Sequence, residues 1–311
     1  MDLKSKIILI SGPTASGKSN FAISLAKKIK GEIINADSMQ VYKELQILTA
    51  RPKQKDYRKI RHHLYGFLNV TKKFSTGEWL NHCQKKIKEI QSRNKIPIFV
   101  GGTGLYFKAL TDGLVQIPNI PLKTRNKIRN LQKKIGQKKF YLKLLKLDPN
   151  IKNKIIETDV QRSMRAYEVK YHTKKSLYDW FKNTKSKFQD EVFFKIYIDY
   201  PRNELIERIA SRSEQMLKDG AINEVKRILK LKIKKDNSSN KVIGIAEIKE
   251  HLEKKLDLND VIEKITIKTR QYAKRQSTWA RGQMSNWNII SSKDLKKFLK
   301  KSNLNTLKLD L

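Results

Sequence analysis

A glycine-rich loop stands directly after the first buried strand that the sequence predicts. Residues 12–19 read G-P-T-A-S-G-K-S and follow the apolar run 7–10, which is the setting that the G-x-x-x-x-G-K-[ST] pattern requires. The glycines let backbone N–H groups turn around a phosphate, and the following helix presents its positive end. The pattern therefore predicts binding of a phosphate group. The residues that would bind it are Gly12, Pro13, Thr14, Ala15, Ser16, Gly17, Lys18 and Ser19.

Two side chains of this loop carry chemistry of their own. Lys18 places a positive charge beside the phosphates, and the hydroxyl of Ser19 can bind Mg²⁺. Nucleotide hydrolases, kinases and pyrophosphate-binding proteins all share the loop, so it does not identify the ligand. ATP and other diphosphates or triphosphates therefore stay open at this point.

The first hundred or so residues alternate between predicted strands and helices. A helical period over residues 18–30 is followed by a strand at 32–36, and a second helix at 76–93 precedes a buried strand at 96–100. A strand, glycine loop, helix and strand within about 30 residues form a parallel unit with a right-handed crossover. The expected fold is α/β, a doubly wound parallel sheet of the P-loop NTPase-like kind.

A different pattern interrupts this alternation. Two prolines and a glycine break the chain within 112–121, charged helical segments follow, and a strand-like run returns at 193–199. We interpret residues 116–190 as a mostly helical domain inserted into the α/β core, which the segments 1–115 and 191–311 form.

The composition limits which binding partners and which cellular compartment we expect. Lys and Arg number 68 against 30 Asp and Glu, and the resulting formal charge of +38 attracts polyanions such as nucleic acid. Compositional bias toward lysine is the alternative source of that charge, and the Lys-rich end from Ser292 is expected to be only partly ordered. Cys83 is the only cysteine, and no segment has the length and hydropathy of a membrane span. We therefore expect a cytoplasmic protein without disulfides or a membrane anchor, and we expect a monomer.

Two strand ends that should face the glycine loop carry polar side chains. Asp37 opens the string D-S-M-Q-V-Y after the second strand, and Thr103 follows Gly101 and Gly102 after the next. Asp37 could hold Mg²⁺ through water, accept a proton or cap a following helix, and the residues alone do not choose. Thr103 could orient the same reacting group or cap the helix that follows it.

A predicted helix near the end of the chain has a cationic face. Arg270, Lys274 and Arg281 fall within about 40° of one another at 100° per residue, whereas Tyr272 and Trp279 fall on the opposite side. A solvated basic stripe is the usual alternative for such a helix. Three charged side chains on one face of a helix whose opposite face is packed favour contact with phosphates instead.

Seven strings in the chain resemble, in order and spacing, one family: the tRNA dimethylallyltransferases, also called tRNA isopentenyltransferases. The strings are G-P-T-A-S-G-K-S, D-S-M-Q-V-Y, T-A-R-P at 49–52, H-H-L at 62–64, G-G-T-G-L-Y, Q-R-S-M-R-A and T-R-Q-Y-A-K-R-Q-S-T-W. The resemblance covers about residues 7–287. The chain departs from the family pattern at Arg51, where Lys is common, at Tyr65 and Gly66, where an acidic residue is usual, and at Ile245, where the family commonly has tyrosine.

The resemblance implies transfer of a dimethylallyl group from dimethylallyl diphosphate to the exocyclic N6 amine of the adenosine immediately 3′ of the anticodon, tRNA position 37. Diphosphate is released. The loop at 12–19 would hold the diphosphate with Lys18, and Mg²⁺ would lie near Ser19. Asp37 would be the general base and Thr103 a partner of the target amine.

By position, the resemblance also implies which residues contact the tRNA. They are Asp37, Ser38, Met39, Gln40, Thr103, Arg125, Gln161, Arg162, Ser163, Met164, Arg165, Arg270, Lys274, Arg275 and Arg281. The inserted domain would grip the anticodon stem-loop. Apart from the family, Arg162 and Arg165 stand three residues apart on one helical face, which suits contact with a nucleic-acid backbone or a base edge.

Three other functions fit part of the sequence. A P-loop kinase that uses ATP on a small metabolite explains the glycine loop but leaves the inserted domain and the basic helix without a role. Prenylation of free adenine nucleotides is opposed by the net charge and by the insertion. A nucleotide-switch RNA-binding protein ordinarily carries an N-K-x-D string, whereas Asn153 and Lys154 are followed by two isoleucines.

Overall fold

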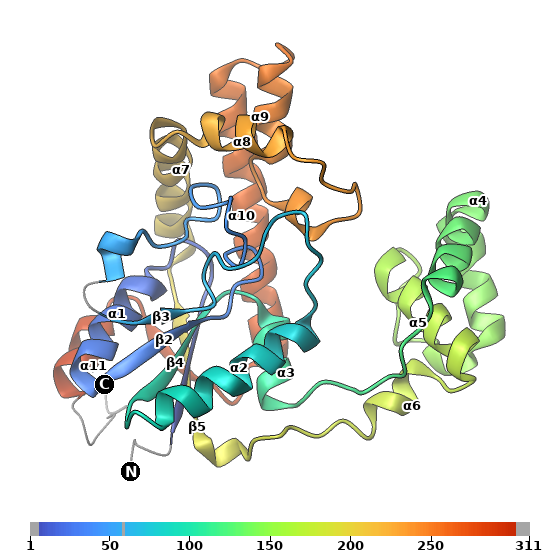
Figure 1. The fold of residues 1–311 in the computed structure, drawn as a ribbon, viewed down its shortest axis with the longest axis horizontal. Helices are drawn as coiled ribbons and strands as arrows, with labels where there is room; N and C mark the ends of the chain where they lie inside the picture. The colour runs from blue at the N-terminus through green and yellow to red at the C-terminus, as the bar shows by residue number, and fades with distance from the viewer. Residues whose placement is uncertain (1–5, 58–59, 303–311) are drawn as a thin grey trace. The chain divides into compact units, whose positions relative to one another are not determined.

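The sheet has six strands, all parallel, in the order β3-β2-β4-β1-β5-β6 (Figure 1). The structure is a computed structural model that describes residues 6–57 and 60–302. The strands are β1 Ile7–Ser11, β2 Gly31–Asn35, β3 His62–His63, β4 Ile96–Gly101, β5 Phe193–Asp199 and β6 Asn288–Ser291. The predicted doubly wound parallel α/β fold is confirmed. The sequence analysis did not foresee β3 and β6, which have only two and four residues.

Helices follow most strands. They are α1 Lys18–Ile29, α2 Thr76–Gln91, α3 Gly104–Thr111, α4 Leu122–Leu147, α5 Val160–Thr173, α6 Leu177–Phe181, α7 Arg202–Lys218, α8 Ala221–Leu229, α9 Ile245–Leu252, α10 Leu258–Gln283 and α11 Leu295–Lys301. Four short 3-10 helices are η1 Gln54–Tyr57, η2 Pro149–Ile151, η3 Asp190–Val192 and η4 Ser238–Lys241. Local signals explain several boundaries: α2 begins with a capping box, in which the Ser75 hydroxyl accepts the Glu78 N–H and the Glu78 carboxylate accepts the Ser75 N–H.

The central strands are buried on both faces, which is why they read as continuous apolar runs. Helices α1 and α11 pack on one face, against residues such as Ile8 and Ile98. Helices α2 and α3 and the last turns of α10 pack on the other, against Leu9 and Phe99. The Lys-rich end was expected to be only partly ordered from Ser292. Part of it forms the helix α11, and residues 303–311 lie outside the described part of the chain.

A third apolar cluster lies beyond the sheet and shapes the wall of the site. Val41, Leu45 and Leu48, from the segment after β2, pack with side chains of helices α7 to α10, among them Met216 and Ile265. The segment after β2 is therefore held by helices that come from the last third of the chain.

The chain divides into two compact units, residues 1–111 with 188–311, and residues 112–187. The second unit contains α4, α5 and α6 around a small core that includes Leu144, Ala166 and Val169. Within α4 the backbone leaves the helical conformation at Gly136, whose φ is 76°, so two helical segments meet at an angle there. Among the described residues, no helix combines the length and hydropathy that crossing a bilayer requires.

Candidate active site

The glycine loop leads from β1 into α1, as predicted. Ala15 and Gly17 have φ angles of 66° and 80°, and this left-handed backbone turns the loop at the carboxyl end of the sheet. Lys18 begins α1, and its Nζ donates to the carbonyl oxygen of Pro13 at 3.1 Å. The Oγ of Ser16 is buried and has no hydrogen-bond partner among the described residues. The loop thus has the shape of a phosphate cradle.

Two arginines of α7 extend over this loop. Arg208 Nε donates to the carbonyl oxygen of Ala15 at 2.9 Å, and Arg212 Nη2 donates to Thr14 Oγ1 at 2.8 Å. Burial lowers the pKa of the Lys18 ammonium to about 8, with Asp37 acting to raise it, and burial also lowers the pKa of Arg212. Three cations therefore face the loop against one nearby carboxylate. Such an excess of positive charge favours an anionic ligand.

Asp37 and Thr103 lie at the ends of neighbouring strands. Asp37 follows β2, and its Oδ1 accepts the Met39 N–H at 2.8 Å, so the carboxylate caps a turn and not a helix. Thr103 Oγ1 accepts the Ser38 N–H at 2.9 Å. The hydroxyl of Thr103 therefore fixes the backbone next to Asp37.

Helix α10 reaches the site because two glycines lack side chains. A Cβ at Gly102 would lie 2.1 Å from Gln276 Nε2, and one at Gly104 would lie 2.3 Å from the Trp279 ring. Gln276 uses this closeness to join two parts of the site. Its Nε2 donates to the carbonyl oxygen of Gly102 at 2.9 Å, while its Oε1 accepts the Thr14 N–H at 2.8 Å. Gly102 and Gly104 thus allow α10 to pack closely against the start of α3.

The cationic face of α10 is solvent-exposed, as predicted for Arg270, Lys274 and Arg281. These three side chains do not line the cavity, whereas Arg275 does. Tyr272 was expected only to pack, but it also lines the cavity. Burial and the charge of Asp37 raise the pKa of its phenol.

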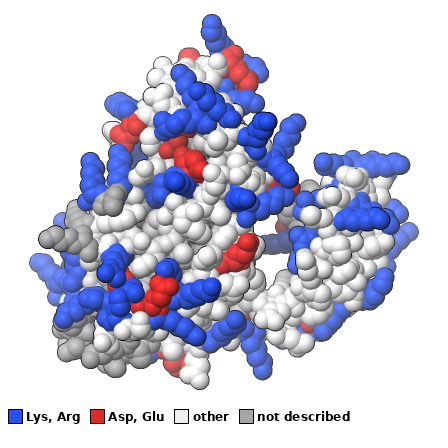
Figure 2. All heavy atoms as spheres, viewed as in Figure 1, with Lys and Arg blue, Asp and Glu red and all other residues white. Residues whose placement is uncertain are grey.

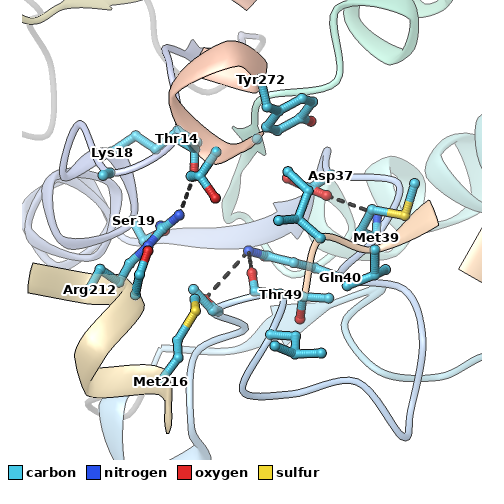
Figure 3. A pocket seen from close by; sticks show the side chains of 18 of the residues that line it. Thr14, Lys18, Ser19, Asp37, Met39, Gln40, Thr49, Arg212, Met216 and Tyr272 are labelled. Atoms are coloured by element: carbon cyan, nitrogen blue, oxygen red, sulfur yellow. Dashed lines mark hydrogen bonds between the residues drawn. The ribbon is translucent and has the colours of Figure 1, made fainter. Parts of the chain in front are cut away.

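These elements enclose a cavity of about 490 Å³. Figure 3 shows Thr14, Lys18 and Arg212 on one side of it and Asp37 and Tyr272 on another. Its polar lining includes Lys18, Ser19, Asp37, Gln40, Arg208, Arg212 and Arg275. Its apolar lining includes Leu48, Met216, Val242, Ile243 and Ile265. The cavity can therefore hold a ligand with an anionic end and a hydrocarbon part.

The second unit, described by itself, carries the arginines that the sequence singled out. Arg162 is exposed and pairs with Asp159 at 3.4 Å, and Arg165 lies 3.8 Å from Glu168. Gln161 is exposed, Met164 is half-buried, and the Nε of half-buried Arg125 has no partner among the described residues. The predicted tRNA contact does not hold for the side chain of Ser163. This residue is buried, and its Oγ accepts a hydrogen bond from Gln137, so its side chain is not presented to a nucleic acid.

Figure 2 shows lysine and arginine side chains projecting from both units on the face drawn, with few acidic side chains between them. This surface agrees with the formal charge of +38. A field of this sign accelerates encounter with polyanions and is screened by salt.

The sequence analysis missed Arg208, Arg212 and Gln276. The two arginines stand four residues apart on a predicted helix, which indicates a shared face. Nothing in that spacing indicates that the face meets the glycine loop, which lies about 190 residues earlier in the chain. Gln276 belongs to the string T-R-Q-Y-A-K-R-Q-S-T-W, where we had considered the charged and aromatic residues instead.

A cavity lined by both cationic and apolar side chains, beside a glycine loop at β1, is typical of a P-loop protein of the α/β class. Residues 40–283 match the family model for IPP transferase. The chain belongs to this family, and the resemblance drawn from the seven strings is confirmed.

Relatives and solved structures agree with this assignment. The chain is 60% identical over 310 residues to the tRNA dimethylallyltransferase of Pelagibacter ubique strain HTCC1062, covering 100% of this chain and 99% of that one. It is 44% identical over 279 residues to the tRNA dimethylallyltransferase of Rickettsia massiliae strain Mtu5, covering 89% and 77%.

A crystallographic structure of a eukaryotic dimethylallyltransferase acting on tRNA superposes with a TM-score of 0.81 and 31% identity, covering 94% of this chain and 75% of that one. The tRNA isopentenylpyrophosphate transferase of Bacillus halodurans gives a TM-score of 0.68 with 29% identity, covering 95% of each chain.

Proposed function

We propose that this chain is a transferase that moves a dimethylallyl group from dimethylallyl diphosphate to the exocyclic N6 amine of adenosine 37 in tRNA and releases diphosphate. The observation that carries the proposal is the cavity in which Asp37 lies together with cationic and apolar side chains, while Thr103 holds the backbone beside Asp37. Family membership supports the reaction class.

The donor fits the mixed lining of the cavity. The backbone N–H groups of the glycine loop, together with Lys18 and Arg212, would bind the diphosphate. The dimethylallyl group would lie against Leu48, Met216 and Ile265, which belong to the apolar cluster beyond the sheet. An allylic diphosphate would use this apolar wall for its hydrocarbon group.

Asp37 and the cations would have different roles in the transfer reaction. An adenine amine is a weak nucleophile because its lone pair is delocalised into the ring, so it needs close positioning and an acceptor for its proton. Asp37 would accept that proton, and Thr103 would orient the amine. As the C–O bond to the diphosphate breaks, negative charge grows on the leaving group, where Lys18, Arg212 and the loop N–H groups would stabilise it.

Mg²⁺ fits beside the glycine loop. The Ser19 side chain lines it, at the start of α1. Among the described residues no group of three His, Cys, Asp or Glu side chains could hold a metal. Ser19 and diphosphate oxygens would therefore hold the ion, which when bound would supply positive charge to the leaving diphosphate.

The unit at 112–187 would grip the anticodon stem-loop through Arg125, Arg162 and Arg165, and the exposed cations of α10 would add further phosphate contacts. The target base must leave its stack to reach Asp37, which costs a few kcal/mol that such contacts offset. We also propose a cytoplasmic monomer, since tRNA is a cytoplasmic substrate and the single cysteine, Cys83, is buried and free.

A labelling experiment tests this function. The protein is incubated with dimethylallyl diphosphate labelled in the allyl group and, separately, with γ-labelled ATP, each with bulk tRNA and each with AMP. We expect label only in tRNA and only from the allylic donor. Label from ATP would support a kinase, and label in AMP would support prenylation of free nucleotides; either result contradicts the proposal.

A further inference from the structure

A buried carboxylate on α8 holds a turn that borders the cavity. Glu224 is 2% exposed. Its Oε2 accepts the N–H groups of Gln46 and Ile47, both at 2.8 Å, and its Oε1 accepts the N–H of Leu48 at 3.0 Å. Bonds to an ionised acceptor are the strong class of hydrogen bond, so the turn is fixed to α8 by three of them.

Further bonds close this turn. Thr49 Oγ1 donates to the carbonyl oxygen of Leu45 at 2.6 Å, the Ala50 N–H donates to Ile47 at 2.9 Å, and the Arg51 N–H donates to Gln46 at 3.0 Å. Ala50 has a left-handed φ of 49°, a conformation that costs free energy in a residue other than glycine. The turn 46–51 is therefore a built element, and Leu48, Thr49 and Ala50 line the cavity.

The carbonyl groups of this turn fix the side-chain amide of Gln40. Gln40 Nε2 donates to the carbonyl oxygen of Thr49 at 2.9 Å and lies 3.5 Å from that of Ala50, as the dashed lines in Figure 3 show. A carbonyl oxygen only accepts, so the NH₂ group must face the turn. Gln40 lines the cavity, and the atom left to serve a ligand is its acceptor, Oε1.

We propose that Glu224 is a positioning residue that, through the 46–51 turn, holds the Gln40 amide as an acceptor toward the target base and so makes the site select an amino purine over a keto purine. The inference rests on the proposed function. Adenosine donates a hydrogen bond from its exocyclic amine, whereas inosine presents a keto oxygen at the same place. That oxygen would meet Gln40 Oε1 without a proton between them, which disfavours its binding.

Competition between two anticodon stem-loops tests this. The loops differ only in carrying adenosine or inosine at the target position, and their dissociation constants are measured without the allylic donor. We expect the wild-type protein to prefer adenosine, and Glu224→Gln to lower that preference roughly tenfold, the loss of about one hydrogen bond.

A double-mutant cycle separates positioning from general loss of structure. Gln40→Met removes the acceptor, so it should lower the preference by a similar factor, and adding Glu224→Gln should then have no further effect. Glu32→Gln is the matched control, because Glu32 is also buried but bonds to His63 and Arg93 and not to the turn. If Glu224→Gln does not fold, Glu224→Asp, which keeps the charge but shortens the reach, replaces it with the same expected loss.

Two results overturn the inference: an unchanged preference in the folded Glu224 variant, or effects of the two substitutions that multiply. These results are distinct from failure of the proposed function. In that case the wild-type protein would transfer no label from dimethylallyl diphosphate to tRNA, whatever its preference between the two stem-loops.

Discussion

Thr103 Oγ1 accepts the Ser38 N–H at 2.9 Å and thereby joins the carboxyl ends of β2 and β4 through a side chain. The backbone that follows Asp37 is held from two sides, because Asn35 Oδ1 also accepts the Asp37 N–H at 2.9 Å. A carboxylate on a fixed backbone is what proton transfer to a positioned base requires.

Asp37→Asn is expected to lower kcat at least roughly 100-fold while tRNA affinity stays nearly unchanged. The amide oxygen of Asn can still accept the Met39 N–H, so the turn should survive while the proton acceptor is lost. Single-turnover transfer and tRNA binding by filter retention measure the two quantities. Turnover at the wild-type rate would remove Asp37 from the mechanism.

The affinity for dimethylallyl diphosphate should fall as pH rises through about 8, the pKa of Lys18 in the free protein. Below that pH the ammonium is charged and binds the diphosphate; above it the amine is neutral, and binding must take up a proton. Calorimetric titrations in buffers of different ionisation heat, from about pH 7 to 9.5, detect this uptake. Lys18→Arg stays charged throughout and should remove the dependence, and a flat profile in the wild-type protein would contradict the assignment.

Arg212→Met should weaken diphosphate binding at least roughly tenfold. The free protein should unfold at the same or a higher temperature, since burial opposes the charge of this guanidinium and its removal relieves that cost. Thermal unfolding with and without dimethylallyl diphosphate measures both effects. Arg202→Met, at the exposed start of the same helix, is the control and should leave the ligand-induced shift intact.

Replacing Arg162 and Arg165 by Gln should weaken tRNA binding and flatten its salt dependence. Each lost phosphate contact lowers the slope of log K against log salt by about 0.7 to 0.9. The double variant Lys296→Gln with Lys297→Gln on α11 removes the same charge from the other unit and should keep the slope. Equal slopes for wild type and the arginine variant would leave α5 without its assigned role.

Gly104→Ala should destabilise the protein by roughly 1–3 kcal/mol, because the added Cβ would press on the Trp279 ring and shift α10. Gly282→Ala, in the last turns of the same helix, meets no atom within 4 Å and should stabilise it by up to about 1 kcal/mol. Urea unfolding compares the two. A loss of stability in both variants would show that the close approach at Gly104 is not the cause.

The sequence predicted well those features that short-range patterns determine. The glycine loop, the parallel strands and the positions of Asp37 and Thr103 at strand ends follow from apolar runs and turn residues within a few positions. The rule that ligands lie beyond the carboxyl ends of parallel strands then brought segments far apart in sequence to one edge.

The remainder depends on which helix meets which segment. Arg212 and Gln276 contact Thr14 from 198 and 262 residues away, and a helical period gives the face of a helix but not its partner. Glu224 shows the same limit, since a glutamate in a predicted helix is ordinarily a surface residue, whereas this one is buried against backbone N–H groups of a distant turn.

The pairing of β1 has a consequence for how the protein is made. Its neighbours in the sheet are β4 and β5, with Ile8 beside Ile98 and Phe194. On the ribosome, residues 112–187 emerge before β5 does. The inserted unit can therefore fold while the edge of β1 that later pairs with β5 is still unpaired. A nascent chain that stalls before Phe193 therefore exposes an apolar strand edge, the kind of surface that chaperones shield.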